Sequence, residues 1–105
     1  MNNPQNWNTL ITDMKGEPCM IISNISAKNG TQNVIIGYPQ NAYPYGSLMT
    51  FIPHGNYYTT SQIYIPHNVD YFFVRTLADG VGESGETRIG IRWRKISCAF
   101  VDSVS

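Results

Sequence analysis

The chain has 105 residues, of which 42% are hydrophobic and only 13% are charged, and its seven basic residues balance seven acidic ones. This length fits a single domain, residues 1–105, that can bury a core without a disulfide framework or a structural metal. Charges that cancel create no long-range field to gather phosphates, which argues against a nucleic acid as partner. The polar surface must therefore consist mainly of amides and hydroxyls.

The first half of the chain predicts strands at residues 20–25, 33–37 and 47–52, where β-branched and other apolar residues gather in short runs. Asn29 and Gly30 give the strongest hairpin signal. The opening stretch "MNNPQNWN" has no basic residue and leads into no long apolar segment. We therefore expect neither a signal peptide nor insertion into a membrane.

The second half predicts further strands at residues 59–65, 71–76 and 88–94. The stretch "YFFVRT" is apolar on both faces, as expected for a strand inside a sheet, and its Arg75 then needs a carboxylate or a set of carbonyl oxygens. The last strand alternates apolar residues with arginines, which should form its solvent face. Because no segment keeps apolar residues at helical spacing, we expect an all-β fold.

The stretch "QIYIPH" combines a strand pattern with a proline and a histidine at its end. Ile63 and Ile65 point to one face and are the expected core residues, while the glutamine and the tyrosine share the other face. Pro66 cannot donate to a ladder, so pairing should end there and release His67 into a loop.

Nothing in the sequence frames a catalytic centre or a metal site. His54 and His67 both follow a proline at a strand end, and Glu83 and Glu86 share a glycine-rich loop where no desolvation would tune a general acid. Neither a nucleophile elbow nor a phosphate-binding loop is present. We therefore expect no enzymatic activity, no cofactor and no metal, although a trimer axis could still gather symmetry copies of one histidine.

The two cysteines, Cys19 and Cys98, match no zinc-binding spacing and lie near opposite ends of the chain. In a reducing compartment the default is two free, buried thiols. They could pair only if the first and last strands were neighbours.

The chemistry that remains is aromatic. The stretch "YPQNAYPYG", residues 38–46, displays tyrosines on a backbone that its prolines stiffen, and further tyrosines, amides and an imidazole follow. Neutral saccharides are bound by this mixture, because a ring stacks on the C–H face of a sugar while amides and hydroxyls bond its OH groups. The alternative is that the tyrosines alternate into the core with only their hydroxyls at the edge. The candidate ligand-binding residues are Asn41, Tyr43, Tyr45, Asn56, Tyr57, Tyr58, His67 and Asn68.

Five short motifs occur in the order "NNP", "YPYGSLMTF", "QIYIPH", "YFFVRT" and "WRKI". In this order the chain resembles the pyocin knob domains of bacteriophage tail fibres and of phage-derived pyocins. The resemblance spans nearly the whole chain, but "ETRIGI" stands where the family often has a second tryptophan. The matched positions are Asn3, Pro4, Tyr45, Gly46, Leu48, Gln62, Ile63, Tyr64, Tyr71, Val74, Arg75, Thr76, Trp93, Lys95 and Ile96.

The resemblance implies a knob at the distal end of a fibre, without enzymatic activity, that contacts the bacterial surface. We therefore expect a small β-sandwich-like knob of short antiparallel strands that forms a homotrimer and is the C-terminal module of a longer fibre. It would be assembled in the host cytoplasm and located in the virion tail fibre. The expected partners are surface polysaccharide or lipopolysaccharide, further copies of the chain, and other tail-fibre or baseplate proteins.

Alternative functions follow from the same residues. The apolar stretch "YFFVRT" and the low charge suit a surface buried between subunits, so the knob could register a trimer without binding the receptor itself. A second alternative is a non-catalytic module of a polysaccharide depolymerase. An enzyme such as a lyase or esterase ranks last, because the only carboxylates close in sequence lie in the glycine-rich loop.

Overall fold

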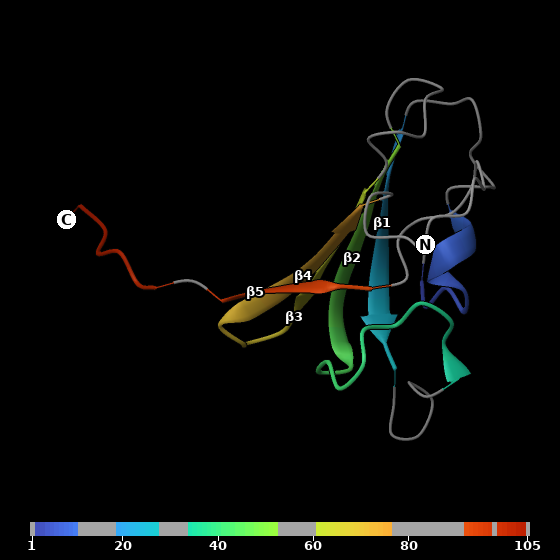
Figure 1. Ribbon diagram of the computed structural model, residues 1–105, viewed down its shortest axis with the longest axis horizontal. Helices are drawn as coiled ribbons and strands as arrows, with labels where there is room; N and C mark the ends of the chain where they lie inside the picture. The colour runs from blue at the N-terminus through green and yellow to red at the C-terminus, as the bar shows by residue number, and fades with distance from the viewer. Residues whose placement is uncertain are drawn as a thin grey trace.

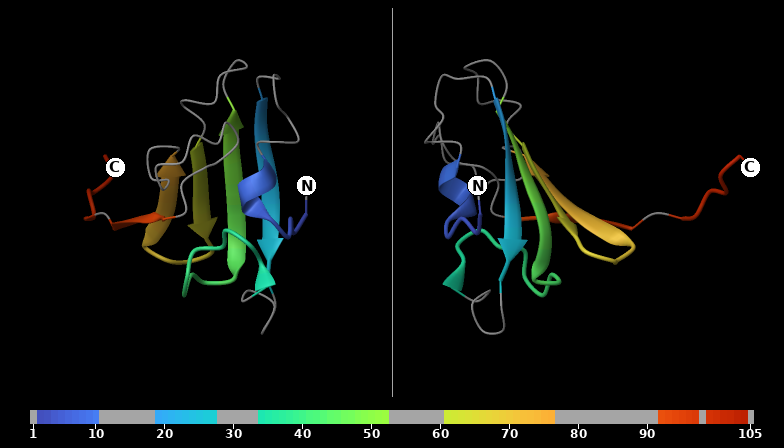
Figure 2. Two further views of the ribbon diagram at one scale, coloured as in Figure 1. Left: turned by 45° about the vertical axis from the view of Figure 1, so that its right-hand side comes forward. Right: turned by 180° about the vertical axis from the view of Figure 1, so that it is seen from behind.

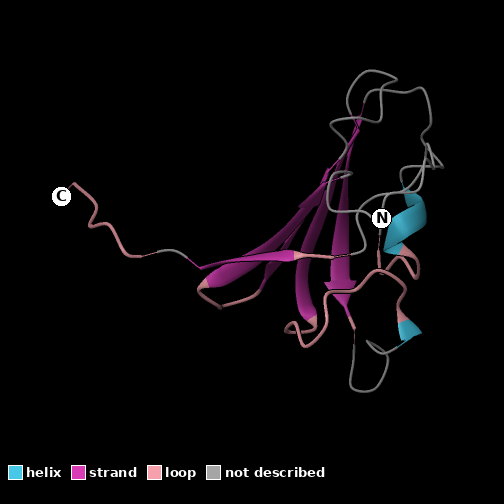
Figure 3. Ribbon diagram, viewed as in Figure 1, coloured by secondary structure: helices cyan, strands magenta, loops and turns pink. Residues whose placement is uncertain are grey.

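Strands account for nearly all the regular structure of the residues that can be described (Figure 3). The computed structural model describes residues 2–10, 19–27, 34–52, 61–76, 92–97 and 99–104. Its elements are a 3-10 helix η1 (Trp7–Thr9) and the strands β1 (Cys19–Ser26), β2 (Tyr45–Ile52), β3 (Ser61–Pro66), β4 (Tyr71–Thr76) and β5 (Arg94–Ser97). No helix in these ranges is long and apolar enough to cross a membrane.

All of the described strands belong to one antiparallel sheet in the order β1-β2-β3-β4-β5 (Figure 1). Each strand pairs with the next along the chain, which confirms the all-β prediction. The strands predicted at residues 20–25, 47–52 and 71–76 are confirmed, as is the described part of 59–65. The hairpin predicted at residues 29–30 lies outside the described residues.

The strand predicted at residues 33–37 is wrong where the structure describes it. The backbone there makes only an isolated parallel bridge, between Ile36 and Asn6, with the Trp7 amide donating to the Ile36 carbonyl at 2.8 Å. Gly37 then turns the chain with a φ of 87°, a conformation that glycine adopts without strain. This apolar run therefore forms one backbone bridge and no ladder, and it buries Ile35 while Val34 and Ile36 stay exposed.

Of the described part of the strand predicted at residues 88–94, Arg92 and Trp93 precede the strand and Arg94 begins it. β5 pairs with β4 from Arg94 onward, and Trp93 precedes it with its indole N–H donating to the Gly37 carbonyl at 2.9 Å. The side chains of Arg92 and Arg94 are exposed, as the alternation predicted. Residues 88–91 lie outside the described part of the chain.

One face of the sheet is covered by irregular chain. η1 and residues 34–44 lie on the same side of the sheet in both views of Figure 2. The Asn6 side chain accepts from the Asn8 amide at 3.0 Å and so caps η1. Near the end of β1, the Asn3 side-chain amide donates to the Ser26 carbonyl at 3.2 Å and accepts from the Ser26 amide at 2.7 Å, as a paired strand would.

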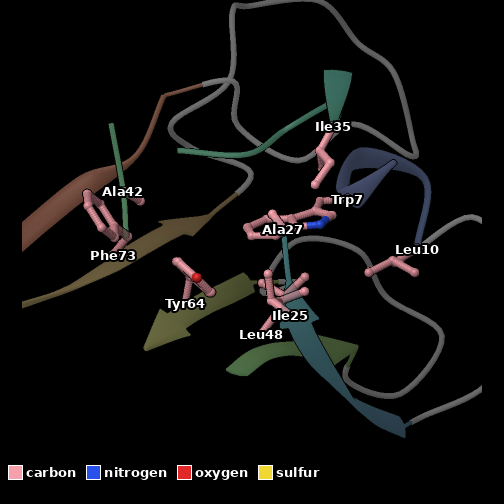
Figure 4. Packing of buried hydrophobic residues seen from close by; sticks show 9 residues of the cluster. All are labelled: Trp7, Leu10, Ile25, Ala27, Ile35, Ala42, Leu48, Tyr64 and Phe73. Carbon is pink, nitrogen blue, oxygen red and sulfur yellow. The ribbon is translucent and has the colours of Figure 1, made fainter. Parts of the chain in front are cut away.

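Trp7 lies in the middle of the core between the sheet and its cover (Figure 4). Its buried ring contacts Tyr38, Tyr64 and Trp93, with ring centroids 5.4, 5.2 and 6.1 Å away. Such tilted and edge-on aromatic contacts add about 0.5–1.5 kcal/mol each to the burial of apolar area. The N-terminal segment is therefore part of the core, which the sequence did not indicate.

The covered face also contains a row of buried polar side chains across three strands. Thr50, Gln62 and Arg75 stand directly opposite one another in the ladders of β2, β3 and β4, and all three are fully buried. The Gln62 amide nitrogen donates to the Trp7 carbonyl at 2.7 Å and to Thr50 Oγ1 at 3.1 Å. Its oxygen accepts from Arg75 Nε and Nη2 at 2.9 and 2.6 Å.

Arg75 is held by amide oxygens and by an aromatic ring. Besides Gln62, Asn8 Oδ1 accepts from Arg75 Nη2 at 2.9 Å, and the guanidinium carbon lies 4.3 Å from the centroid of a Trp93 ring. These contacts fit the expectation of carbonyl oxygens around a buried guanidinium. Burial lowers the pKa of Arg75 to about 9, which still leaves it charged at neutral pH.

This row makes the core prediction for "QIYIPH" wrong. Gln62 and Tyr64 face the covered side and are fully buried, whereas Ile65 lies on the opposite face and is exposed. A glutamine can be buried here because every polar atom of its amide finds a partner. The ending was predicted correctly, because pairing stops at Pro66 and His67 lies in the following turn.

We expect Gln62 and Arg75 to contribute to stability as one unit. The variant Gln62→Leu should lower the free energy of unfolding by about 2–4 kcal/mol, because it removes the oxygen that accepts from Arg75 Nε and the nitrogen that donates to the Trp7 carbonyl. The variant Arg75→Met should have an effect of similar size. Urea unfolding of the double variant should show a loss smaller than the sum by about 1–3 kcal/mol. Strict additivity of the two losses would contradict the network.

Candidate ligand-binding surface

The sheet brings two parts of the predicted site to the same end. β2 begins at Tyr45 where β3 ends at Pro66, because the two strands run antiparallel. The loop before β2 and the turn between β3 and β4 therefore lie side by side at the lower end of the sheet in Figure 1 and in the left view of Figure 2. The amide of His67 donates to the Tyr45 carbonyl at 2.8 Å and joins them.

Gly46 permits this close approach of the two strands. A Cβ at this position would lie 2.4 Å from the Ile65 carbonyl oxygen and 2.8 Å from the Cα of Pro66. Both neighbours are backbone atoms and cannot move aside without displacing β3. The junction between loop and turn therefore depends on glycine.

Five of the eight candidate residues meet at this end, and their side chains are exposed or partly exposed. The rings of Tyr43 and Tyr45 are 5.7 Å apart at an interplanar angle of 54°. Asn41 and Asn68 have φ angles of 65° and 55°, in the left-handed region that asparagine tolerates better than most residues. His67 is exposed in the turn beside Tyr45.

The other three candidates, Asn56, Tyr57 and Tyr58, lie outside the described residues, as does His54. The structure therefore brings together the candidates of the loop before β2 and of the β3–β4 turn. It leaves the proposed contribution of the segment between β2 and β3 as a prediction.

Two tyrosines of the interior fix the backbone of the exposed loop. The Tyr64 hydroxyl donates to the Tyr43 carbonyl at 2.7 Å, and the Tyr38 hydroxyl donates to the Ala42 carbonyl. The Ala27 amide adds a bond to the Pro44 carbonyl at 2.8 Å. The successive carbonyls of Ala42, Tyr43 and Pro44 are thus all hydrogen-bonded. These bonds fix the backbone that carries the Tyr43 ring and do not involve the Tyr43 hydroxyl.

Burial keeps these two hydroxyls protonated. Burial, with a smaller effect of Tyr71, raises the pKa of Tyr38 to about 12, and burial raises the pKa of Tyr64 further above its usual range. Both groups therefore act as hydrogen-bond donors throughout the neutral range. No sequence pattern indicated this role for Tyr38. Tyr64 matches the alternative interpretation of the tyrosines, because its ring lies in the core and its hydroxyl reaches the edge.

The exposed groups can make two kinds of contact with a ligand. The rings offer flat apolar faces, and the amides and imidazole offer neutral donors and acceptors. Within the described ranges, no group of three or more His, Cys, Asp or Glu side chains could hold a metal ion. The arrangement therefore suits a neutral ligand with both C–H faces and hydroxyl groups.

No family model matches the chain, and comparison with curated proteins and with solved structures finds no match either.

We expect the variant Tyr38→Phe to loosen the exposed loop and to change the alkaline stability. A hydroxyl whose pKa is raised by folding keeps its proton while the unfolded chain loses it above about pH 10, so its contribution to stability falls as the pH rises toward 12. The fall in unfolding free energy between pH 9 and pH 11.5 should be smaller in Tyr38→Phe than in the wild type. Equal slopes in paired urea titrations would contradict this role.

Proposed function

We propose that the chain is the distal knob of a phage or pyocin tail fibre and contacts neutral saccharide on the bacterial surface. The supporting observations are that the Tyr43 and Tyr45 rings contact each other and that the His67 amide bonds the Tyr45 carbonyl, at the end of the sheet where Asn41 and Asn68 also lie. The ligand would be surface polysaccharide or lipopolysaccharide. The proposal places the protein in the virion, next to other tail-fibre or baseplate proteins.

A fixed loop matters because a single shallow saccharide site binds weakly. Millimolar affinity corresponds to about −4 kcal/mol, too little to hold a virion by itself. A loop whose carbonyls are already bonded to Tyr38 and Tyr64 loses less conformational entropy on binding. The proposed homotrimer would then raise the avidity by roughly 10²- to 10⁴-fold through several weak sites.

A second candidate function is assembly of the fibre without direct receptor contact. It is favoured by the exposed apolar side chains of Met20, Ile22, Phe51 and Ile65 on the sheet face opposite Trp7. Soluble proteins seldom leave such a patch exposed unless a partner covers it. In this version the second layer of the sandwich-like knob would come from neighbouring copies.

We expect Tyr43→Ala and Tyr45→Ala each to weaken saccharide binding at least tenfold, since each removes an aromatic face from the surface. The measurement is binding of the chain, coupled to beads for multivalency, to an array of bacterial surface polysaccharides and lipopolysaccharides. Val34→Ala is the matched control, because it truncates an exposed apolar side chain outside this surface.

Binding that survives both tyrosine substitutions unchanged would count against the saccharide proposal and leave assembly as the better function. Circular dichroism and the urea midpoint of each variant are the controls that check whether its fold is intact.

A further inference from the structure

The sheet has a second face that is rich in apolar side chains. It is the face opposite Trp7, and no described element lies over it in either view of Figure 2. Its apolar residues, which we call the open face, are Met20, Ile22, Met49, Phe51, Ile63, Ile65, Phe72, Val74 and Ile96.

The register joins these residues into one patch. Ile22 lies opposite Met49, Met49 opposite Ile63, and Ile63 opposite Val74, so a continuous apolar row crosses four strands. Toward one end of the sheet, Met20 lies opposite Phe51. Met20 and Ile22 are 56% and 60% exposed, and Phe51 and Ile65 are 43% and 45% exposed. The other residues of the open face are partly exposed, so the patch is most accessible at Met20, Ile22, Phe51 and Ile65.

The chain also ends in an apolar segment that has no packing of its own. Residues 99–104, which we call the C-terminal arm, project away from the sheet after β5 in every view (Figures 1 and 2). Phe100, Val101 and Val104 are 96%, 91% and 102% exposed. An extended segment with fully exposed apolar side chains is unfavourable in water unless something covers it.

Charge and area make the arm and the open face complementary. The arm carries one charged residue, Asp102, and the open side of the five strands carries one, Arg94, of opposite sign. The seven most exposed large side chains of face and arm offer on the order of 100 Å² each, or roughly 700 Å² per chain. A standard stable interface takes ~800 Å² from each partner.

We propose that the C-terminal arm of one copy of this chain lies across the open face of a second copy. The partner is a second copy because the arm leads away from its own sheet while each chain carries both halves of the contact. Such arm-to-face contacts can form a closed assembly in two ways. In a dimer each chain places its arm on the other, and in a trimer each chain places its arm on the next around the ring. The inference rests on the homo-oligomer in the proposed function and is independent of its saccharide.

Removal of the arm tests the proposal. Sedimentation equilibrium should show the full chain as an oligomer, whereas a chain ending at residue 98, Phe100→Asp and Ile22→Ser should dissociate with at least a tenfold higher dissociation constant. Val34→Asp, exposed on the covering segment, should leave the assembly unchanged. Monomeric full chain at high concentration, or an oligomer that survives loss of the arm, would overturn the proposal.

Cross-linking identifies which chain the arm covers. In a background with Cys19→Ser and Cys98→Ser, a chain with Ile22→Cys is mixed with a chain with Phe100→Cys and oxidised. A disulfide between the two different chains is the expected product. A third chain that carries both substitutions is oxidised separately. If the disulfide forms only within that chain and never between the two single variants, the contact between copies is refuted.

The test separates this inference from the saccharide proposal. Tyr43→Ala should weaken binding on the array and leave sedimentation unchanged. Phe100→Asp should change sedimentation while each subunit still binds weakly through its loop. Failure of one therefore does not imply failure of the other.

Discussion

The side-chain amide of Gln62 is the interaction on which the rest of the structure depends. It links the carbonyl of Trp7 in the covering segment to Thr50 in β2 and to Arg75 in β4, so that three strands and the cover share one polar centre. Because an unpaired guanidinium cannot be buried, this centre also determines which face of the sheet is covered. The large aromatic residues pack around it: Trp7 by its ring contacts and Trp93 against the guanidinium.

The exposed surface derives its order from the same core. Tyr64 packs on Trp7 with its ring and holds the Tyr43 carbonyl with its hydroxyl, so one side chain belongs to both the interior and the surface. Tyr38 likewise packs on Trp7 with its ring and donates its hydroxyl proton to the Ala42 carbonyl, four residues later in the chain. The loop is therefore rigid for a reason beyond its prolines, and changes in the core will reach the exposed rings.

Most strands could be predicted from the sequence, but which face of the sheet is buried could not. A local concentration of apolar, β-branched and aromatic residues located the strands at residues 47–52 and 71–76. It could not say that Gln62 faces inward and Ile65 outward, since hydrophobicity alone favours the opposite. That choice depends on partners 55 and 13 residues away in the chain, Trp7 and Arg75. The same limit applies to the site, where the loop tyrosines were identified but the bond from the Tyr38 hydroxyl to the loop backbone was not.

The position of Trp7 has a kinetic consequence. Its partners Gln62 and Tyr64 follow more than fifty residues later, and Asn8 meets Arg75 across a separation of 67. Contacts so distant in sequence must close large loops before any burial offsets the lost entropy, and β proteins of this kind fold on a scale of roughly milliseconds to seconds. During translation, Trp7 leaves the ribosome well before the strands on which its ring packs. The nascent chain thus exposes its largest core side chain at least until β3 has emerged.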